Sequence, residues 1–210
     1  MDGVTINTEP LYTKAEIKLF KEYGIEVPKE DLSLFRGSPE KLFYELSSKK
    51  YGIKEDINTF IKKGRRYVQE EFNKGIPFMG GFKELHKRIE PYYLLGLVTA
   101  SPRKSLNRII ERMNLDDYFL ELLSGEDTTK NKPHPEPYTE MMKLLNVSPK
   151  NTVIIEDSLT GIKSAVSSGA KVIAKSGSVP DNKLFNAHHI IDHLDEISID
   201  LLEHILPLHQ

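Results

Sequence analysis

Short apolar runs, separated by helical patterns, predict most of the chain's secondary structure. The clearest run spans residues 152–155, where a threonine, a valine and two isoleucines follow one another without a charge. Such a run is typical of a strand in a parallel sheet, because helices cover both of its faces. Similar runs predict strands at residues 92–98, 120–123, 171–174 and 189–191. Since helical patterns alternate with these runs, we expect an α/β fold with a parallel sheet and right-handed crossovers.

Residues 10–77 carry a helical pattern instead. Apolar positions at helical spacing predict three helices, one that ends at Gly24, one that Ser38 and Pro39 open, and one around residues 57–68. A polar stretch that ends at Pro10 and a stretch rich in glycine and proline at residues 75–81 bracket this block. Two connections predict an insertion rather than a terminal domain. We therefore expect an α/β core of residues 1–9 and 78–210 with an inserted all-α domain of residues 10–77.

Two acids, Glu156 and Asp157, follow the run at residues 152–155 directly. Ser158 is suited to cap the next helix, whose first turn contains Gly161. Ligands of open α/β sheets bind outside the carboxyl ends of the strands. Adjacent carboxylates at such an end favour a divalent cation, although an acidic loop that caps a helix gives the same pattern.

Two other stretches carry candidate chemistry. The run at residues 92–98 ends in Thr99, Ala100 and Ser101, whose hydroxyls and amides could seat a phosphate or simply cap a helix. Lys132 lies in a loop stiffened by alternating prolines, which makes it less typical of a mobile surface lysine. In the turn at residues 34–39, Arg36 is either a solvated charge or a group that reaches an anionic substrate.

Composition narrows the possible functions. The chain has 210 residues, a net charge of −2 and no cysteine. A length of this order allows one core with a small insertion, and the lack of a basic block argues against a nucleic-acid partner. Disulfides and thiolate chemistry are excluded. The sequence shows neither an apolar run of roughly 18 residues nor a signal-peptide pattern, so we expect a cytoplasmic protein without a membrane partner. We also expect a monomer.

Taken in order, these motifs resemble those of the haloacid dehalogenase superfamily. The matching residues are Asp2-Gly3-Val4 with Thr8-Glu9-Pro10, Thr99-Ala100-Ser101, Lys132-Pro133, and Glu156-Asp157-Ser158 with Gly161. The resemblance is strongest to the branch that contains β-phosphoglucomutase and phosphoglycolate phosphatase, and it covers essentially the whole chain. It implies a Rossmann-like doubly wound sheet with an inserted helical cap.

The resemblance also implies a reaction and a set of roles. An aspartate attacks phosphorus, and water then hydrolyses the aspartyl-phosphate, with Mg²⁺ as cofactor. Asp2 would be the general acid/base and would ligate Mg²⁺ through its backbone carbonyl. Thr99, Ala100 and Ser101 would bind the phosphoryl group. The other implied roles are charge neutralisation by Lys132, metal binding by Glu156 and Asp157, and substrate binding by Arg36 and Ser38 in the cap.

One departure concerns the nucleophile. The family's nucleophilic aspartate would stand two residues before Asp2, a position that the printed sequence does not contain. The strand that carries it would also be missing, and its two neighbours would keep unpaired backbone groups. We expect that Met1 is an internal methionine taken for the start.

The expected function is Mg²⁺-dependent phosphatase activity on a small phosphorylated metabolite, such as a sugar phosphate. Asn7 stands where a second acid is common, and Tyr12 stands where mutase-like members often carry a histidine. Both departures favour a phosphatase. Two alternatives stay open. One is a phosphomutase, and the other is a non-catalytic relative that binds a phosphate or metabolite without the nucleophile.

Overall fold

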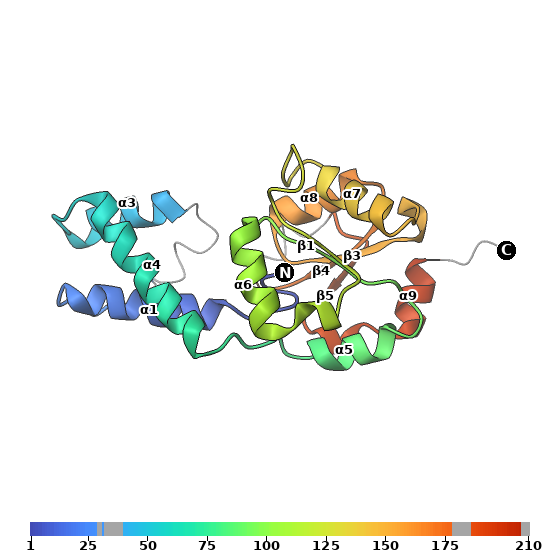
Figure 1. The fold of residues 1–210 in the computed structure, drawn as a ribbon, viewed down its shortest axis with the longest axis horizontal. Coiled ribbons are helices and arrows are strands. Elements are labelled where there is room, and N and C mark those ends of the chain that lie inside the picture. The colour runs from blue at the N-terminus through green and yellow to red at the C-terminus, as the bar shows by residue number, and fades with distance from the viewer. Residues whose placement is uncertain (29–30, 32–39, 178–185, 207–210) are drawn as a thin grey trace. The chain divides into compact units, whose positions relative to one another are not determined.

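The computed structural model describes residues 1–28, 31, 40–177 and 186–206. The chain divides into two compact units (Figure 1). The core unit comprises Met1–Asn7 and Phe78–Gln210, and the helical unit comprises Thr8–Pro77. The helices in the described residues include none that is both long and apolar enough to cross a membrane.

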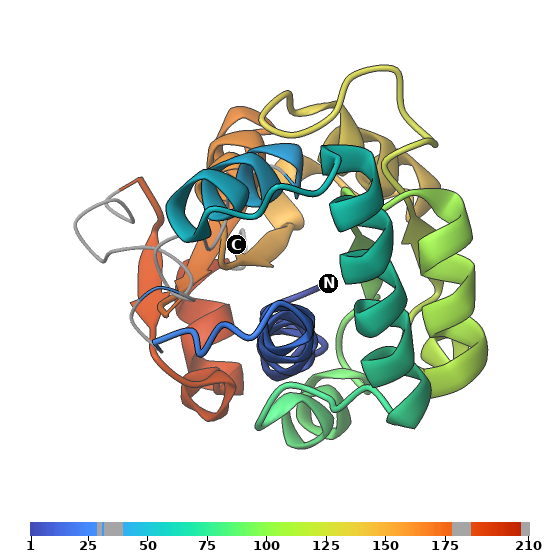
Figure 2. The same cartoon turned by 90° about the vertical axis from the view of Figure 1, so that its left-hand side faces the viewer.

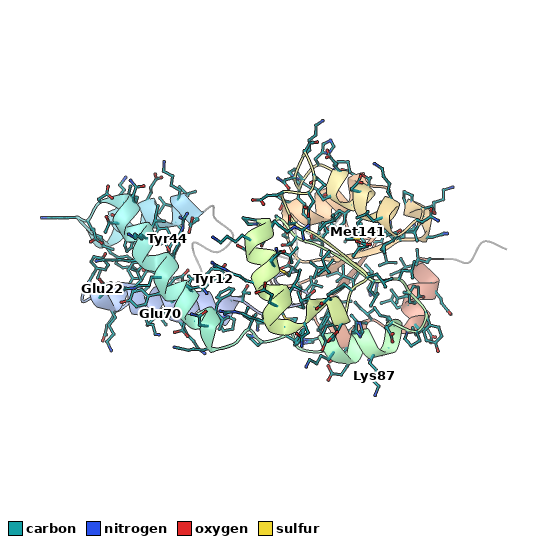
Figure 3. The ribbon with its side chains drawn as sticks, viewed as in Figure 1. Tyr12, Glu22, Tyr44, Glu70, Lys87 and Met141 are labelled. Atoms are coloured by element: carbon teal, nitrogen blue, oxygen red, sulfur yellow. The ribbon has the colours of Figure 1, made fainter. Side chains whose placement is uncertain are left out.

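The helical unit contains three described helices, as the spacing of apolar residues predicts. They are α1 (Glu9–Glu22), α3 (Glu40–Tyr51) and α4 (Ile57–Lys74). Leu19 and Phe20 of α1 pack with Tyr44 of α3 and Phe60 of α4 in a buried cluster. Figure 3 labels Tyr44 in the helical unit. A side chain at Gly64 of α4 would collide with the ring of Tyr44, so the glycine allows the two helices to pack closely.

In the described part of the core unit, helices separate the first four of five short strands. Its strands are β1 (Gly96–Val98), β2 (Glu121–Leu123), β3 (Val153–Glu156), β4 (Lys171–Lys175) and β5 (His189–Ile191). Its α-helices are α5 (Phe82–Ile89), α6 (Arg103–Met113), α7 (Glu136–Leu144), α8 (Leu159–Ser167) and α9 (Ile199–Ile205). Short 3₁₀ turns lie at Leu115–Asp117, Pro149–Asn151 and Leu194–Glu196. The predicted α/β class is confirmed, because every described strand pair is parallel.

Helices cover both faces of the strands, which explains why the apolar runs do not alternate with polar residues. Successive side chains of a strand point to opposite faces. Ile154 and Val172 pack in one buried cluster with residues of α7 and α8, whereas Ile173 packs in another with residues of α5 and α9. Figures 1 and 2 show the strands between these two helical layers.

The first strand is shorter than its apolar run predicts. Residues 92–93 form a turn after α5, in which the amides of Tyr92 and Tyr93 both donate to the carbonyl of Ile89 at 3.0 Å. Tyr92 and Leu94 are exposed. The run is therefore only partly a buried strand, since its first residues belong to the helix end and the following loop.

The described strands form two separate sheets, with the orders β1-β2 and β3-β4-β5. Within the described residues, β1 and β3 are therefore both edge strands. Residues of both strands line an apolar cavity of about 400 Å³, together with residues of α5 and α7. Helices nonetheless join the sheets, because one buried cluster contains Val98 of β1 and Ile154 of β3.

We expect Ile173→Ala to destabilise the protein by about 2–5 kcal/mol, because the fully buried side chain would leave a cavity in the centre of β4. Ile190→Ala in the neighbouring β5 is the matched control. Its side chain is 42% exposed, and a cost of about 1 kcal/mol or less is expected. Urea unfolding of both variants measures the difference. Equal costs would contradict this description of the core.

A second prediction concerns Glu71, a buried residue of α4. Its Oε1 atom forms ion pairs with Nζ of Lys18 at 2.5 Å and with Nζ of Lys74 at 2.6 Å. The hydrogen bonds from these two lysines lower the pKa of Glu71 to about 2, and the bond from Lys18 has the larger effect. A lowered pKa stabilises the folded state above the ordinary pKa, and this stability is lost as the pH falls towards 2.

Glu71→Gln should therefore flatten the dependence of stability on pH between about pH 4.5 and pH 2. Urea midpoints of the variant and of the wild type, measured across this range, test the prediction. Parallel curves for the two proteins would show that Glu71 does not contribute.

Candidate active site

Lys132 joins the carboxyl ends of β1 and β3. Its ammonium Nζ donates to the carbonyl of Val98, the last residue of β1, at 3.3 Å. It also donates to Oε1 of Glu156, the last residue of β3, at 2.5 Å. Both side chains of this ion pair are only 8% exposed. The edge at which ligands of α/β sheets bind thus holds a buried cation at a fixed place.

The loop that carries Lys132 is itself held in place. The Lys132-Pro133 peptide is cis, and the carbonyl of His134 accepts a hydrogen bond from Ser164 of α8 at 2.6 Å. Glu136, at the start of α7, accepts from the amide and the hydroxyl of Thr129. The loop is therefore anchored at both ends, as its prolines lead one to expect.

The carboxylate of Glu156 is engaged at both oxygens. Oε1 accepts from Lys132 and from the hydroxyl of Tyr138. Oε2 accepts from the amide of Asp157 at 3.2 Å and from the hydroxyl of Ser158 at 3.1 Å. A side chain at Gly161 would collide with this carboxylate, so the glycine makes room for it. Glu156 is thus oriented by its neighbours on every side that the structure describes.

The environment keeps Glu156 ionised. Burial by itself would raise its pKa, but the charges of Lys132 and of the amino terminus, together with the hydrogen bonds from Lys132 and Tyr138, outweigh burial and lower the pKa to about 2. Burial and the neighbouring carboxylate raise the pKa of the Tyr138 phenol well above its ordinary value. Tyr138 therefore stays protonated and donates to Glu156.

Asp157 approaches the first residues of the chain. Its carboxylate lies where a side chain at Gly3 would be, and Gly3 has a positive φ of 73°. The turn around Gly3 is closed by hydrogen bonds from Gly3 to Ile6 and from Thr5 to Met1. Asp2 belongs to this turn, so its backbone lies next to the carboxylate of Asp157.

Thr99 follows β1 and is buried. Its amide donates to Leu123 of β2 at 2.9 Å, and its hydroxyl accepts from the amide of Ser101 at 3.1 Å. The amide of Gly125 donates to the carbonyl of Ser101 at 2.9 Å and ties the loop to the end of β2. A hydroxyl that accepts one bond can still donate its own proton, so Thr99 is suited to a phosphoryl oxygen.

The structure thus gathers most of the predicted site residues in the core unit. Lys132, Glu156 and Asp157 lie together, the turn of Asp2 adjoins Asp157, and Thr99 follows the strand whose last carbonyl Lys132 contacts. Ala100 and Ser101 follow Thr99 in the loop after β1. Two further predicted residues, Arg36 and Ser38, lie outside the described residues. Their predicted contact with the substrate stays a prediction.

The donors at this edge suit Mg²⁺ in their chemistry. The described residues contain no group of three or more histidine, aspartate or glutamate side chains arranged to hold a metal. Mg²⁺, however, commonly takes one or two carboxylates and keeps several waters. The carboxylate of Asp157 and the carbonyl of Asp2 are oxygen donors of this kind. The carboxylate of Glu156 also accepts bonds from its protein partners, and its predicted metal-binding role stays a prediction.

Tyr138 is the member of the site that sequence reasoning missed. An aromatic residue in the first turn of an apolar helix is usually a core residue, and its ring is indeed part of a buried cluster. Only its hydroxyl belongs to the site. The sequence signal, a tyrosine six residues after Lys132, is too weak to have identified it.

We expect Glu156→Gln to destabilise the protein by about 3–5 kcal/mol, because it leaves the ammonium of Lys132 buried without a counter-charge. Glu140→Gln is the matched control, since Glu140 forms an exposed ion pair with Lys143 at 2.9 Å. Its loss should cost about 1 kcal/mol or less. Thermal unfolding compares the two variants, and a small effect of Glu156→Gln would contradict the buried-pair description.

Two curated proteins with similar sequences are phosphatases. One curated relative, a phosphorylated carbohydrates phosphatase of Thermotoga maritima, is 28% identical over 174 residues, which are 82% of this chain and 81% of the relative. Another, hexitol phosphatase B of Escherichia coli K12, is 28% identical over 77% of this chain and 74% of its own length.

A solved structure has the same fold. A crystal structure from Thermotoga maritima, provisionally described as a β-phosphoglucomutase, is 26% identical and superposes with a TM-score of 0.80 over 98% of this chain and 94% of that one. The family model for haloacid dehalogenase-like hydrolases matches residues 1–175. The chain therefore belongs to the haloacid dehalogenase-like hydrolases.

Proposed function

We propose that this hydrolase is a Mg²⁺-dependent phosphatase of a small phosphorylated metabolite and that a sugar phosphate is the first substrate class to test. The observation that carries the proposal is the buried ammonium of Lys132, fixed between the ends of β1 and β3 beside Asp157. A fixed cation at a sheet edge can stabilise the charge of a transferring phosphoryl group. Two relatives named above as phosphatases of phosphorylated carbohydrates and hexitols support this choice.

Each residue of the edge has a separate task in this proposal. Lys132 neutralises charge on the phosphoryl group, and the hydroxyl of Thr99 donates to one of its oxygens, with help from the amide of Ala100. Asp157 and the carbonyl of Asp2 hold Mg²⁺, which supplies further charge stabilisation when bound. Glu156 orients Lys132. The side chain of Asp2 moves a proton to or from the reacting oxygen.

The proposed route passes through an aspartyl-phosphate, which splits the transfer into two easier steps. The resemblance places the nucleophilic aspartate two residues before Asp2, outside the printed sequence. A protein extended to include that aspartate is therefore the form in which multiple turnovers should be measured. The roles given to Lys132, Thr99 and Asp157 concern residues of the printed chain.

Asp157→Ala should abolish Mg²⁺-dependent phosphate release, because it removes the carboxylate that lies against the Gly3 turn. Release of inorganic phosphate from a panel of sugar phosphates, with and without a chelator, measures the effect in the extended protein. Asp116→Ala, at an exposed position in the 3₁₀ turn after α6, is the control and should keep wild-type turnover. Unchanged turnover of Asp157→Ala would contradict the proposal.

The same reactions separate a phosphatase from a mutase. A solved structure similar to this chain is described as a β-phosphoglucomutase, so isomerisation is the competing activity. Interconversion of two sugar phosphates without net release of phosphate would favour the mutase. Release of phosphate in proportion to the substrate consumed would favour the phosphatase.

A further inference from the structure

Tyr138 contacts the Lys132–Glu156 pair from inside the core. It lies in the first turn of α7 and is only 6% exposed. Its hydroxyl donates to Oε1 of Glu156, the same oxygen that accepts from the ammonium of Lys132. The face of its ring also lies 4.7 Å from Nζ of Lys132. One side chain therefore touches both members of the ion pair.

These contacts restrict the rotation of the Glu156 carboxylate more than its bond to Lys132 alone would. A carboxylate that held Lys132 alone could rotate about its last torsion angle and carry the ammonium with it, because that torsion has a broad minimum. Here Tyr138 fixes Oε1, and the amide of Asp157 with the hydroxyl of Ser158 fixes Oε2. The ring of Tyr138 bounds the ammonium on one side, where cation–π attraction favours its position.

We propose that Tyr138 is a positioning residue, which sets the direction of the Lys132 ammonium through Glu156. Tyr138 does not itself take part in phosphoryl transfer. Its hydroxyl keeps Oε1 where the ammonium can reach both Glu156 and the carbonyl of Val98. The positional claim stands on these contacts alone, and its consequence for turnover rests on the proposed phosphatase function.

The alternative is that Tyr138 only fills the core. Its ring does pack in the buried cluster with Met141 and Ile162. A substitution that removes the ring would therefore change core packing and the contacts with the ion pair at the same time. Tyr138→Phe keeps the ring and removes only the hydroxyl. A packing residue would tolerate this change at the ion pair, whereas a positioning residue would not.

The first test measures the position of Lys132 without any assay of activity. Acetylation of the folded protein by acetic anhydride at one fixed pH is followed by mass spectrometry, with the exposed Lys163 as internal reference. We expect Tyr138→Phe to accelerate acetylation of Lys132 by up to about tenfold relative to Lys163, because one of the bonds that fix its partner is lost.

Tyr93→Phe is the matched control. It removes a phenol hydroxyl from the turn that precedes β1, at the opposite end of the strand from Thr99, and should leave acetylation of Lys132 unchanged. If Tyr138→Phe also left it unchanged, the proposal would be overturned. Circular dichroism of both variants shows that each remains folded.

The second test measures turnover of the extended protein with its best sugar phosphate. Tyr138→Phe should lower kcat by about tenfold and change KM by less than about twofold, because the direction of the cation matters most where charge develops. Glu156→Gln combined with Tyr138→Phe should be little worse than Glu156→Gln alone, since Tyr138 acts through Glu156. Additive losses in kcat would overturn this pathway.

The two tests separate the positional inference from the proposed function. Faster acetylation of Lys132 together with a loss in kcat supports both. Faster acetylation in a protein whose wild type releases no phosphate supports the position of Tyr138 and contradicts the phosphatase. Unchanged acetylation with normal phosphate release contradicts the role of Tyr138 and leaves the phosphatase in place.

Discussion

The ion pair between Lys132 and Glu156 is the interaction on which the candidate site depends. It is almost wholly buried, so neither charge could be left there alone without a large cost. Its two members come from a loop before α7 and from the last residue of β3. Pairing them brings the ends of the two separate sheets together through the carbonyl of Val98. The same pair that binds these parts of the core unit also holds the ammonium of Lys132 at a fixed place on its edge.

The two adjacent acids at this edge, Glu156 and Asp157, have different contacts. Glu156 accepts hydrogen bonds from five groups, which fix its orientation, whereas Asp157 reaches the turn that contains Gly3 and Asp2. Two adjacent acids can thus serve different ends, because Glu156 is the last residue of β3 and Asp157 lies in the loop that follows it. This division makes Asp157 the first ligand to test for Mg²⁺ in the proposed phosphatase, and the predicted metal-binding role of Glu156 stays a prediction.

Membership of the haloacid dehalogenase-like hydrolases fits this arrangement without fixing the substrate. One fold supports many substrates, because the groups that select them lie in variable loops. The predicted selecting residues, Arg36 and Ser38, fall outside the described residues, and the relatives named above are phosphatases of different compounds. The contacts of the described core explain how a phosphoryl group could be held. The proposed assays of phosphate release identify the substrate.

The sequence by itself determined the α/β class, the helical insertion and the short stretches that carry the chemistry. Apolar runs at residues 152–155 and 171–174 identify buried strands, since a strand covered on both faces needs no polar positions. Only the tertiary structure decided that Lys132 lies on Glu156, that Tyr138 belongs to the site and that residues 92–95 precede the strand. The first two features depend on contacts between residues distant in sequence, which no local pattern of polar and apolar positions encodes. The third depends on where the helix before the strand ends, since the amides of Tyr92 and Tyr93 donate to Ile89.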